Sequence, residues 1–396
     1  MKKLSIGIGA IFRDEFPYVL EWLVWHQLAG FDQFYVADNA SSDGTTELLE
    51  ALQELGYVNV LYQPVVEKQA QLIAYERIVA AAVGSCDALM FIDADEFVTH
   101  SSHKTGAEVK YLRELLKQPD VGAISLNWRV FGSSGHRKFT DAPVTERFTQ
   151  CASDNPGNKN GHLKSVTLTR FVKSVGPHHS RLSSPLRWVD GNGNDLSDFI
   201  VIENGRAEPA QRGGIIGHVV DSPVRVNHYA VKSFEEYSEK KRRRGSSMRG
   251  VDYDKGAGYF QAHDLNECDW AVPPQRMTRL KAGISKLRKA LANSVFCAEL
   301  TGSVDISNRH GIRGWVVCRK GSVETLRLQV FVNGRFCGSA DTGFYRGDLI
   351  KAKISSDGLG GFRWQHPQPL QQGDIVEVRV YGNRFVFPKR ARVVID

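Results

Sequence analysis

Short apolar runs alternate with amphipathic segments through the first hundred residues. The apolar runs predict strands at 4–12, 33–39, 58–64 and 87–93. The segments between them predict helices at 15–31, with Pro17 in its first turn and Gly30 at its end, at 41–56 and at 68–84. Strands that alternate with helices in this way usually form a mostly parallel sheet covered by helices. We therefore predict an α/β domain with a Rossmann-like sheet.

The pattern changes further along the chain. Residues 120–235 are less regular, with predicted strands at 122–132 and 165–175, and we interpret them as the second half of the same domain. From about residue 300 apolar and polar residues alternate with period two, which predicts an all-β sandwich. Within it, Asn333-Gly334 is a strong hairpin signal and Gly382-Asn383 a weaker one.

A basic amphipathic helix is predicted at 276–296, between the two domains. Its apolar stripe suits packing between domains, which we favour. Its basic residues, which have no acidic neighbour in that stretch, leave peripheral contact with an anionic membrane as the alternative. The predicted organisation is therefore an α/β domain at 1–272, a linker helix at 273–298 and a β-sandwich at 299–396.

Composition narrows the class of protein only slightly. The chain has 396 residues, 42% of them hydrophobic and 24% charged, which is typical of a soluble globular protein with two domains. A net charge of +7 suits anionic partners without selecting one. The six cysteines are scattered and no apolar segment is long enough to span a bilayer. We expect a cytoplasmic protein, with peripheral contact with the inner face of the cell membrane left open.

The most informative stretch is 88–98, ALMFIDADEFV, where an apolar run leads directly into Asp93, Asp95 and Glu96. In open α/β sheets, ligands bind beyond the carboxyl ends of the strands, and Asp38 ends the second predicted strand at the same edge. Carboxylates this close raise each other's pKa unless a cation neutralises them. A hard divalent cation has the required chemistry and leaves positions open for phosphate oxygens. The alternative is a chance group of surface carboxylates.

These residues also carry a resemblance. The stretches IFRDEFPYVLEWLVWHQLAGFDQFYVADNASSDGT, QAQLIAYERIV and LMFIDADEFV resemble the nucleotide-sugar-binding half of GT-A glycosyltransferases. The nearest pattern is that of a bacterial family-2-like group related to family 92, and the resemblance covers roughly residues 4–250. The group usually has Lys-Asn-Glu where this chain has Arg13-Asp14-Glu15. The C-terminal part resembles β-sandwich modules appended to bacterial glycosyltransferases.

The resemblance implies a metal-dependent hexosyltransferase of GT-A fold that acts in bacterial surface polysaccharide synthesis. It would use Mn²⁺ or Mg²⁺ and a nucleotide-diphospho sugar, UDP-hexose in preference to a GDP-sugar. Transfer would go to a hydroxyl of a glycan or lipid-linked oligosaccharide, with inversion. No nucleic-acid partner is expected. The rival hypothesis is a non-catalytic glycan-binding or scaffold protein with a decayed transferase domain.

The resemblance also assigns roles to residues. Asp38 would bind the donor nucleoside, Asp95 would bind the metal, and Asp93 would bind the ribose or the metal. His228 would be the third metal ligand. Other predicted donor contacts are Arg13, Gln71, Tyr75 and Lys232, with 240–244 as a further basic run. The candidates for a catalytic base are Glu146, Asp154, His136 and His179.

Overall fold

The computed structural model of the chain describes residues 3–63, 69–155, 159–183, 185–196, 200–203, 206–209, 214–216, 219–241, 256–319, 325–366, 368–387 and 392–394. The chain divides into two compact units. The first unit consists of residues 1–41 and 58–285, and the second unit of residues 42–57 and 286–396. The predicted organisation instead placed residues 42–57 with the N-terminal domain.

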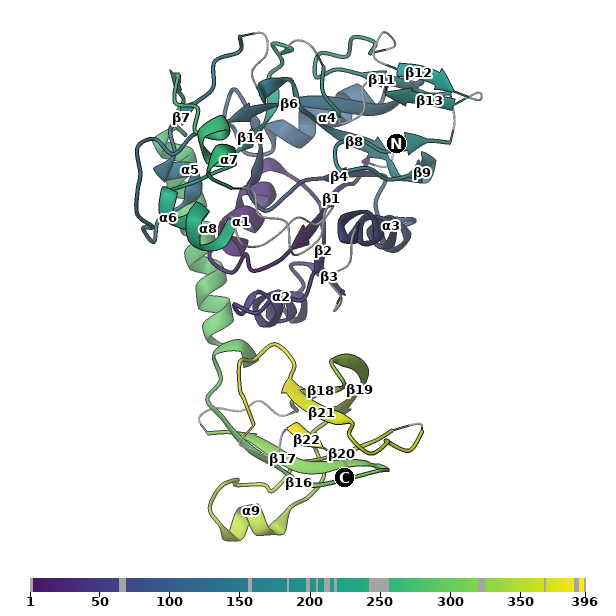
Figure 1. The fold of residues 1–396 in the computed structure, drawn as a ribbon, viewed down its shortest axis with the longest axis vertical. Helices are drawn as coiled ribbons and strands as arrows, with labels where there is room; N and C mark the ends of the chain where they lie inside the picture. Colours follow the sequence, from purple (N-terminus) through teal and green to yellow (C-terminus); the bar gives the residue numbers. More distant parts are fainter. Residues whose placement is uncertain are drawn as a thin grey trace. The chain divides into compact units, whose positions relative to one another are not determined.

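The first unit is built on one mixed sheet with the strand order β3-β2-β1-β4-β8-β6-β14-β5, and β11 pairs with β6 (Figure 1). Its strands are β1 (Ile6–Phe12), β2 (Gln33–Asp38), β3 (Asn59–Tyr62), β4 (Ala88–Phe91), β5 (Glu96–His100), β6 (Val121–Val130), β8 (Leu163–Leu168), β11 (Arg187–Val189) and β14 (Val224–His228). The first four strands are parallel, whereas β8 runs antiparallel to both β4 and β6. The predicted α/β class with a mainly parallel sheet is confirmed.

Three helices of more than two turns pack on this sheet. They are α1 (Val19–Ala29), α3 (Ala70–Ala82) and α4 (Ala107–Leu116). Helix α3 packs against β1 to β4, while α1 and α4 pack against β5. Gly30 ends α1 in the left-handed conformation, as predicted, with φ 93°. The predicted start of α1 was wrong, because a turn at Glu15–Tyr18 precedes the helix and leaves Pro17 outside it.

Shorter elements complete the first unit. The helical ones are α5 (Val144–Arg147), α6 (Phe234–Glu236), α7 (Gly256–His263), η1 (Lys159–Gly161), η2 (Thr169–Phe171) and η4 (Tyr237–Lys241). The strands are β7 (Gln150–Cys151), β9 (Val172–Ser174), β10 (Arg181–Leu182), β12 (Ile200–Glu203), β13 (Arg206–Pro209) and β15 (Cys268–Asp269). These strands pair as β9 with β10, β12 with β13 and β7 with β15.

The second unit is mostly β, as predicted. Strands β16 (Leu300–Asn308), β17 (Gly311–Cys318) and β20 (Gly361–Gln365) form one sheet, and β19 (Arg335–Asp341), β18 (Arg327–Val332), β21 (Ile375–Val380) and β22 (Arg392–Val394) form another. Buried side chains of both sheets share one hydrophobic core. The helical elements of this unit are α2 (Thr45–Glu54), η5 (Val295–Cys297) and α9 (Gly347–Lys351).

Of the two hairpins predicted for the second unit, one is present and the other is not. Asn333 and Gly334, with φ 51° and 76°, join β18 to β19 in a two-residue hairpin, as predicted. The hairpin at Gly382-Asn383 is wrong, because the strand that pairs with β21 begins only at Arg392. The backbone N–H of Gly382 instead donates to the buried carboxylate of Glu50 on α2 (2.8 Å).

Helix α2 belongs to the second unit through such polar contacts. Besides the bond from Gly382 to Glu50, the side-chain amide of Gln53 donates to the Tyr381 hydroxyl (2.6 Å). The guanidinium of Arg384 donates to the carbonyl of Asp43, just before the helix begins (3.1 Å). A segment that the sequence pattern places among the α/β repeats thus completes the β unit.

The predicted basic helix is α8 (Pro274–Ala292), and most of its apolar stripe is buried at Met277, Leu280, Leu287 and Leu291. This burial agrees with packing, while membrane contact stays a prediction. Within the part of the chain that the structure describes, no helix is both long and apolar enough to cross a bilayer. Arg276 differs from the other basic residues of the helix because it is buried, lies 4.4 Å from the centre of the Trp25 ring and pairs with Glu108 of α4 (2.8 Å).

The buried pair of Arg276 and Glu108 predicts that two glutamates of α4 contribute differently to the stability of the first unit. Replacing Glu108 with Gln should lower the free energy of unfolding of the first unit by about 3–5 kcal/mol, because the guanidinium of Arg276 stays buried without its counter-charge. Replacing Glu114 with Gln removes only an exposed pair with Lys117 and should cost less than about 1 kcal/mol. Urea unfolding of both variants measures the difference, and equal losses would contradict it.

Candidate active site

The acidic turn lies between β4 and β5, and α1 fixes its backbone. The indole N–H of Trp22 donates to the carbonyl of Asp93 (3.1 Å), and that of Trp25 donates to the carbonyl of Val98 (2.7 Å). The imidazole Nε2 of His26 accepts from the Val98 N–H (3.1 Å). One helix therefore holds the turn at Asp93 and strand β5 at Val98, which explains the buried aromatic residues on α1.

His26 works in this scaffold as a neutral imidazole. Its Nδ1 lies 2.8 Å from the carbonyl of Trp22, so Nδ1 carries the proton and Nε2 is free to accept from Val98. Complete burial lowers the pKa of His26 to about 3. The same tautomer therefore persists at neutral pH.

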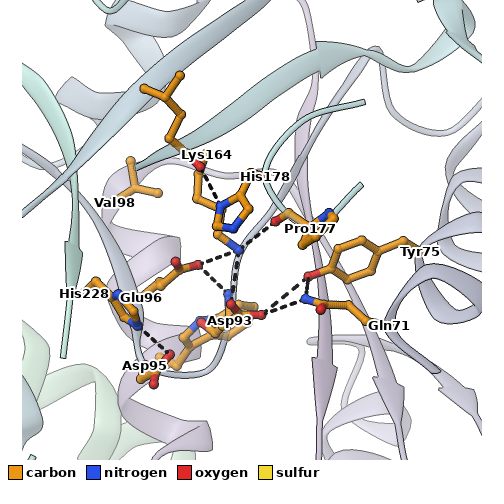
Figure 2. A network of polar contacts seen from close by, with 12 residues as sticks. Gln71, Tyr75, Asp93, Asp95, Glu96, Val98, Lys164, Pro177, His178 and His228 are labelled. Carbon is orange, nitrogen blue, oxygen red and sulfur yellow. Dashed lines mark hydrogen bonds and ion pairs between the residues drawn. The ribbon is translucent and has the colours of Figure 1, made fainter. Parts of the chain in front are cut away.

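A buried lysine lies at the centre of the acidic turn (Figure 2). The ammonium of Lys164, on β8, contacts Asp93 Oδ2 (3.1 Å), Glu96 Oε2 (3.1 Å) and the carbonyl of Pro177 (3.0 Å). Its side chain is 1% exposed. Burial alone would lower the pKa of Lys164, but the two carboxylates outweigh burial and raise it. Lys164 is therefore a permanent cation inside the sheet edge.

Glu96 is the buried member of the acidic group. Its Oε2 accepts from the N–H of Asp93 (2.7 Å) and forms an ion pair with the ammonium of Lys164 (3.1 Å). Complete burial raises the pKa of Glu96 to about 8, with Lys164 acting in the opposite direction and Asp93 and Asp95 adding to the rise. The Glu96 carboxyl group therefore bonds back to the backbone of the turn that precedes it.

Asp93 faces helix α3. The side-chain amide of Gln71 donates to Asp93 Oδ1 (3.3 Å), and the hydroxyl of Tyr75 lies 3.5 Å from the same oxygen. Gln71 also donates to the Tyr75 hydroxyl (2.9 Å), and burial raises the pKa of Tyr75, so this hydroxyl stays protonated. The structure thus brings three predicted donor-binding residues together. The Asp93 side chain is still 37% exposed.

Asp95 faces the opposite way, toward His228 (Figure 2). Strand β14 pairs with β5 so that His228 lies opposite Glu96, and His228 Nε2 is 3.6 Å from Asp95 Oδ1. The ring of Trp128 lies 4.2 Å from that of His228, centre to centre, and backs the imidazole. Two of the three predicted metal ligands are therefore adjacent, although they lie far apart in the sequence.

The donor set suits a hard divalent cation only in part. A carboxylate oxygen and an imidazole nitrogen are ligands that Mn²⁺ accepts. Among the described residues, no group of three or more His, Cys, Asp and Glu side chains could hold a metal ion by itself. A cation at Asp95 and His228 would therefore need further ligands from phosphate oxygens and water, as is usual for Mg²⁺ sites.

The other predicted donor contacts lie along the same edge of the sheet or close to it. Asp38 is the last residue of β2, is buried and lies opposite Phe12, so that Arg13 follows β1 at this edge. The N–H of Asp14 donates to the hydroxyl of Ser41 (3.0 Å) and links the loops after β1 and β2. Both loops hold a residue other than glycine at positive φ, Asp14 and Ala40, each with φ 54°.

Lys232 is buried and lies in a polar cluster around Glu236. Its ammonium is 4.3 Å from the centre of the Tyr18 ring, and the Tyr18 hydroxyl donates to Glu236 Oε1 (2.8 Å). Arg147 donates to both oxygens of Glu236 (2.8 and 2.9 Å). The hydroxyl of Ser233 caps α6 by accepting from the Glu236 N–H, and the Glu236 carboxylate accepts in turn from the Ser233 N–H (3.1 Å). Of the predicted basic run, residues 242–244 and the side chains of 240 and 241 lie outside the described residues.

The four candidate bases lie in four different surroundings. Glu146 pairs with Lys281 and lines a cavity of about 320 Å³ beside α8. Both oxygens of Asp154 accept from Arg225 (2.7 and 2.9 Å), and these bonds outweigh burial and lower the pKa of Asp154. Two of the candidates are histidines: His136 is half-buried with its ring against Phe148, and burial lowers the pKa of His179 to about 4.

Lys164 was missing from the residues predicted for the site. A signal for it exists in the sequence, because a lysine inside the otherwise buried strand LKSVTL requires an acidic partner. Nothing in the sequence identifies that partner, since Asp93 is 71 residues away.

Comparison with known proteins points to one family. Residues 2–189 match the family model "Glycosyltransferase family 92". A family 92 protein of Oryza sativa is 26% identical over 189 residues, or 48% of this chain and 32% of that protein. One of Arabidopsis thaliana is 25% identical over 186 residues, 46% of this chain and 32% of that protein. This part of the chain is thus similar to family 92, and the chain spans about a third of these relatives' length.

Part of the chain resembles a solved structure, that of S. aureus TarS in complex with UDP-GlcNAc. The aligned region covers 42% of this chain and 46% of the TarS chain, with 11% identity and a TM-score of 0.28. A superposition at this score establishes neither a shared fold nor a shared ligand.

The Glu236 cluster predicts a pH dependence of stability. Hydrogen bonds from Arg147 and Ser233 outweigh burial and lower the pKa of Glu236 from 4.5 to about 2. Glu236→Gln should therefore lower the free energy of unfolding by about 3 kcal/mol at neutral pH. Between these two pKa values the unfolded chain binds more protons, so the deficit is complete above about pH 4.5 and shrinks as the pH falls toward 2.

Urea unfolding of the wild type and Glu236→Gln at several pH values between about 3 and 7 measures this deficit. Glu235→Gln is the neighbouring control, because Glu235 pairs with Lys138, whose side chain is exposed. A deficit that stays constant across the pH range would contradict the prediction.

Proposed function

We propose that the chain is a metal-dependent GT-A glycosyltransferase that transfers a hexose from a nucleotide-diphospho sugar, UDP-hexose in preference, to a hydroxyl of a glycan or lipid-linked oligosaccharide. The observation that carries the proposal is the pair formed by Asp95 and His228 beside Asp93, at the sheet edge where α/β proteins bind nucleotides. The relation of residues 2–189 to family 92 supports it.

Asp95 and His228 would hold Mn²⁺ or Mg²⁺. When bound there, the cation would act as a Lewis acid and stabilise negative charge on the leaving diphosphate. The chain itself would add positive charge through Lys232, four residues after His228, whose ammonium lies over the Tyr18 ring and attracts the Glu236 carboxylate. Positioned charges of this kind favour departure of the nucleoside diphosphate because they need no reorganisation during the reaction.

The donor nucleoside would bind along β2 and α3. Asp93 keeps part of its carboxylate exposed while Gln71 and Tyr75 hold the rest, so it can accept a hydrogen bond from a sugar hydroxyl. Asp38 lies at the same edge and would contact the base or the ribose. Arg13 would approach the phosphates from the loop after β1.

Inversion requires a base that takes the proton of the acceptor hydroxyl. Asp154 is the least suited of the four candidates, because Arg225 engages both of its oxygens. Glu146 is the best placed for a bulky acceptor, because it lines a cavity of about 320 Å³ together with Thr149 and Lys281. His136 and His179 remain alternatives.

The proposed biological setting is the synthesis of a bacterial surface polysaccharide. The curated relatives named above come from plants. Bacterial surface polysaccharide synthesis in the cytoplasm therefore rests on the sequence resemblance alone.

The proposal predicts loss of activity on changing one carboxylate. With Mn²⁺ and a panel of UDP-hexoses, Asp95→Asn should release UDP at least about 100-fold more slowly than the wild type, because a neutral amide binds a divalent cation poorly. Asp120→Asn, an exposed residue paired with Arg187, should keep the wild-type rate. UDP release in a coupled assay measures both. No turnover by the wild type with any sugar nucleotide would favour the non-catalytic alternative.

A further inference from the structure

Protein groups enclose the ammonium group of Lys164. It donates hydrogen bonds to Asp93 Oδ2 (3.1 Å) and to the carbonyl of Pro177 (3.0 Å), and it forms an ion pair with Glu96 Oε2 (3.1 Å). Its side chain is 1% exposed. This lysine therefore acts through the residues that it holds, not through contact with a ligand.

Its main effect falls on Asp93. Lys164 occupies Oδ2 of that carboxylate, while Gln71 and Tyr75 lie against Oδ1. Asp95 lies two residues further on and points instead to His228 (Figure 2). The turn thus directs the carboxylates of Asp93 and Asp95, whose side chains are 37% and 14% exposed, to opposite sides.

The positive charge of Lys164 affects which of the two carboxylates can bind a metal ion. A divalent cation at Asp93 would compete with the lysine for the same oxygen and would lie close to its positive charge, which is strongly unfavourable in a partly buried site. At Asp95 the local partner is an imidazole, which repels a cation only when protonated. The lysine thus disfavours Asp93 as a metal ligand, whereas Asp95 faces the imidazole of His228.

We propose that Lys164 is a positioning residue that withdraws Asp93 from the metal site, so that Asp95 and His228 alone supply the protein's metal ligands and Asp93 accepts a hydroxyl of the donor nucleoside. This inference rests on the proposed function. It assigns a role to a residue outside the acidic motif and gives different roles to Asp93 and Asp95.

Four variants test the assignment through Mn²⁺ binding, measured by electron paramagnetic resonance on the full chain with and without UDP. Asp95→Asn should abolish binding. Asp93→Asn should weaken it by about tenfold at most, because it removes a neighbouring charge and not a ligand. Lys164→Met should tighten binding of Mn²⁺ alone by about tenfold, because a nearby cation is lost. The double variant Lys164→Met with Asp93→Asn should return close to the wild-type affinity.

UDP binding supplies a second measurement. Lys164→Met frees Asp93 and should weaken UDP binding, although Mn²⁺ alone binds more tightly. Lys164→Arg keeps the positive charge and should restore much of the UDP affinity. A purely structural lysine would not move the two affinities in opposite directions.

The outcomes are distinguishable. If the wild type binds Mn²⁺ and Asp93→Asn loses it as completely as Asp95→Asn, with no recovery in the double variant, Asp93 is a ligand and the inference is overturned while the proposed function stands. If the wild type binds no Mn²⁺ even with UDP, both are overturned. Should Lys164→Met fail to fold, the comparison of Asp93→Asn with Asp95→Asn still decides, because only a ligand shows complete loss.

Discussion

The arrangement of the candidate site depends on one buried ammonium group. Three carboxylates within four positions repel one another, and two of them lie at the end of a buried strand. Lys164 reaches this point from β8, which runs antiparallel beside β4, and neutralises the charge from within. The cation that offsets the charge of Asp93 and Glu96 is therefore part of the sheet itself. Asp95 instead faces His228, which β14 supplies.

Neighbouring elements hold the acidic turn and its partner His228 in place. The aromatic residues of α1 hold the backbone of the acidic turn, and β14 brings His228 beside Asp95. Residues at positive φ, among them Lys232 (φ 57°), mark the loops at the same edge. Backbone strain of this kind persists where the surrounding structure fixes it, and it gathers here around the predicted donor site.

Much of this could be read from the sequence, because local signals determine local structure. The alternation of apolar runs predicted the strands, Gly30 the end of α1 and Asn333-Gly334 a hairpin. Signals that depend on distant partners failed. Arg276 looked like a surface residue of a basic helix, yet its partner Glu108 makes it a core residue. Lys164 could not be paired with Asp93 because an antiparallel strand enters an otherwise parallel region of the sheet, which the helical repeats do not indicate.

Helix α2 has a consequence for how the chain matures during translation. The ribosome makes α2 early, but the backbone N–H that binds Glu50 comes from Gly382, 332 residues later. Until then a carboxylate and the apolar side of a short helix have no cover from the β unit. Contacts of such long sequence separation form slowly. The nascent chain therefore carries an incomplete surface through most of its synthesis, when chaperone binding or misassociation competes with closure of the second unit.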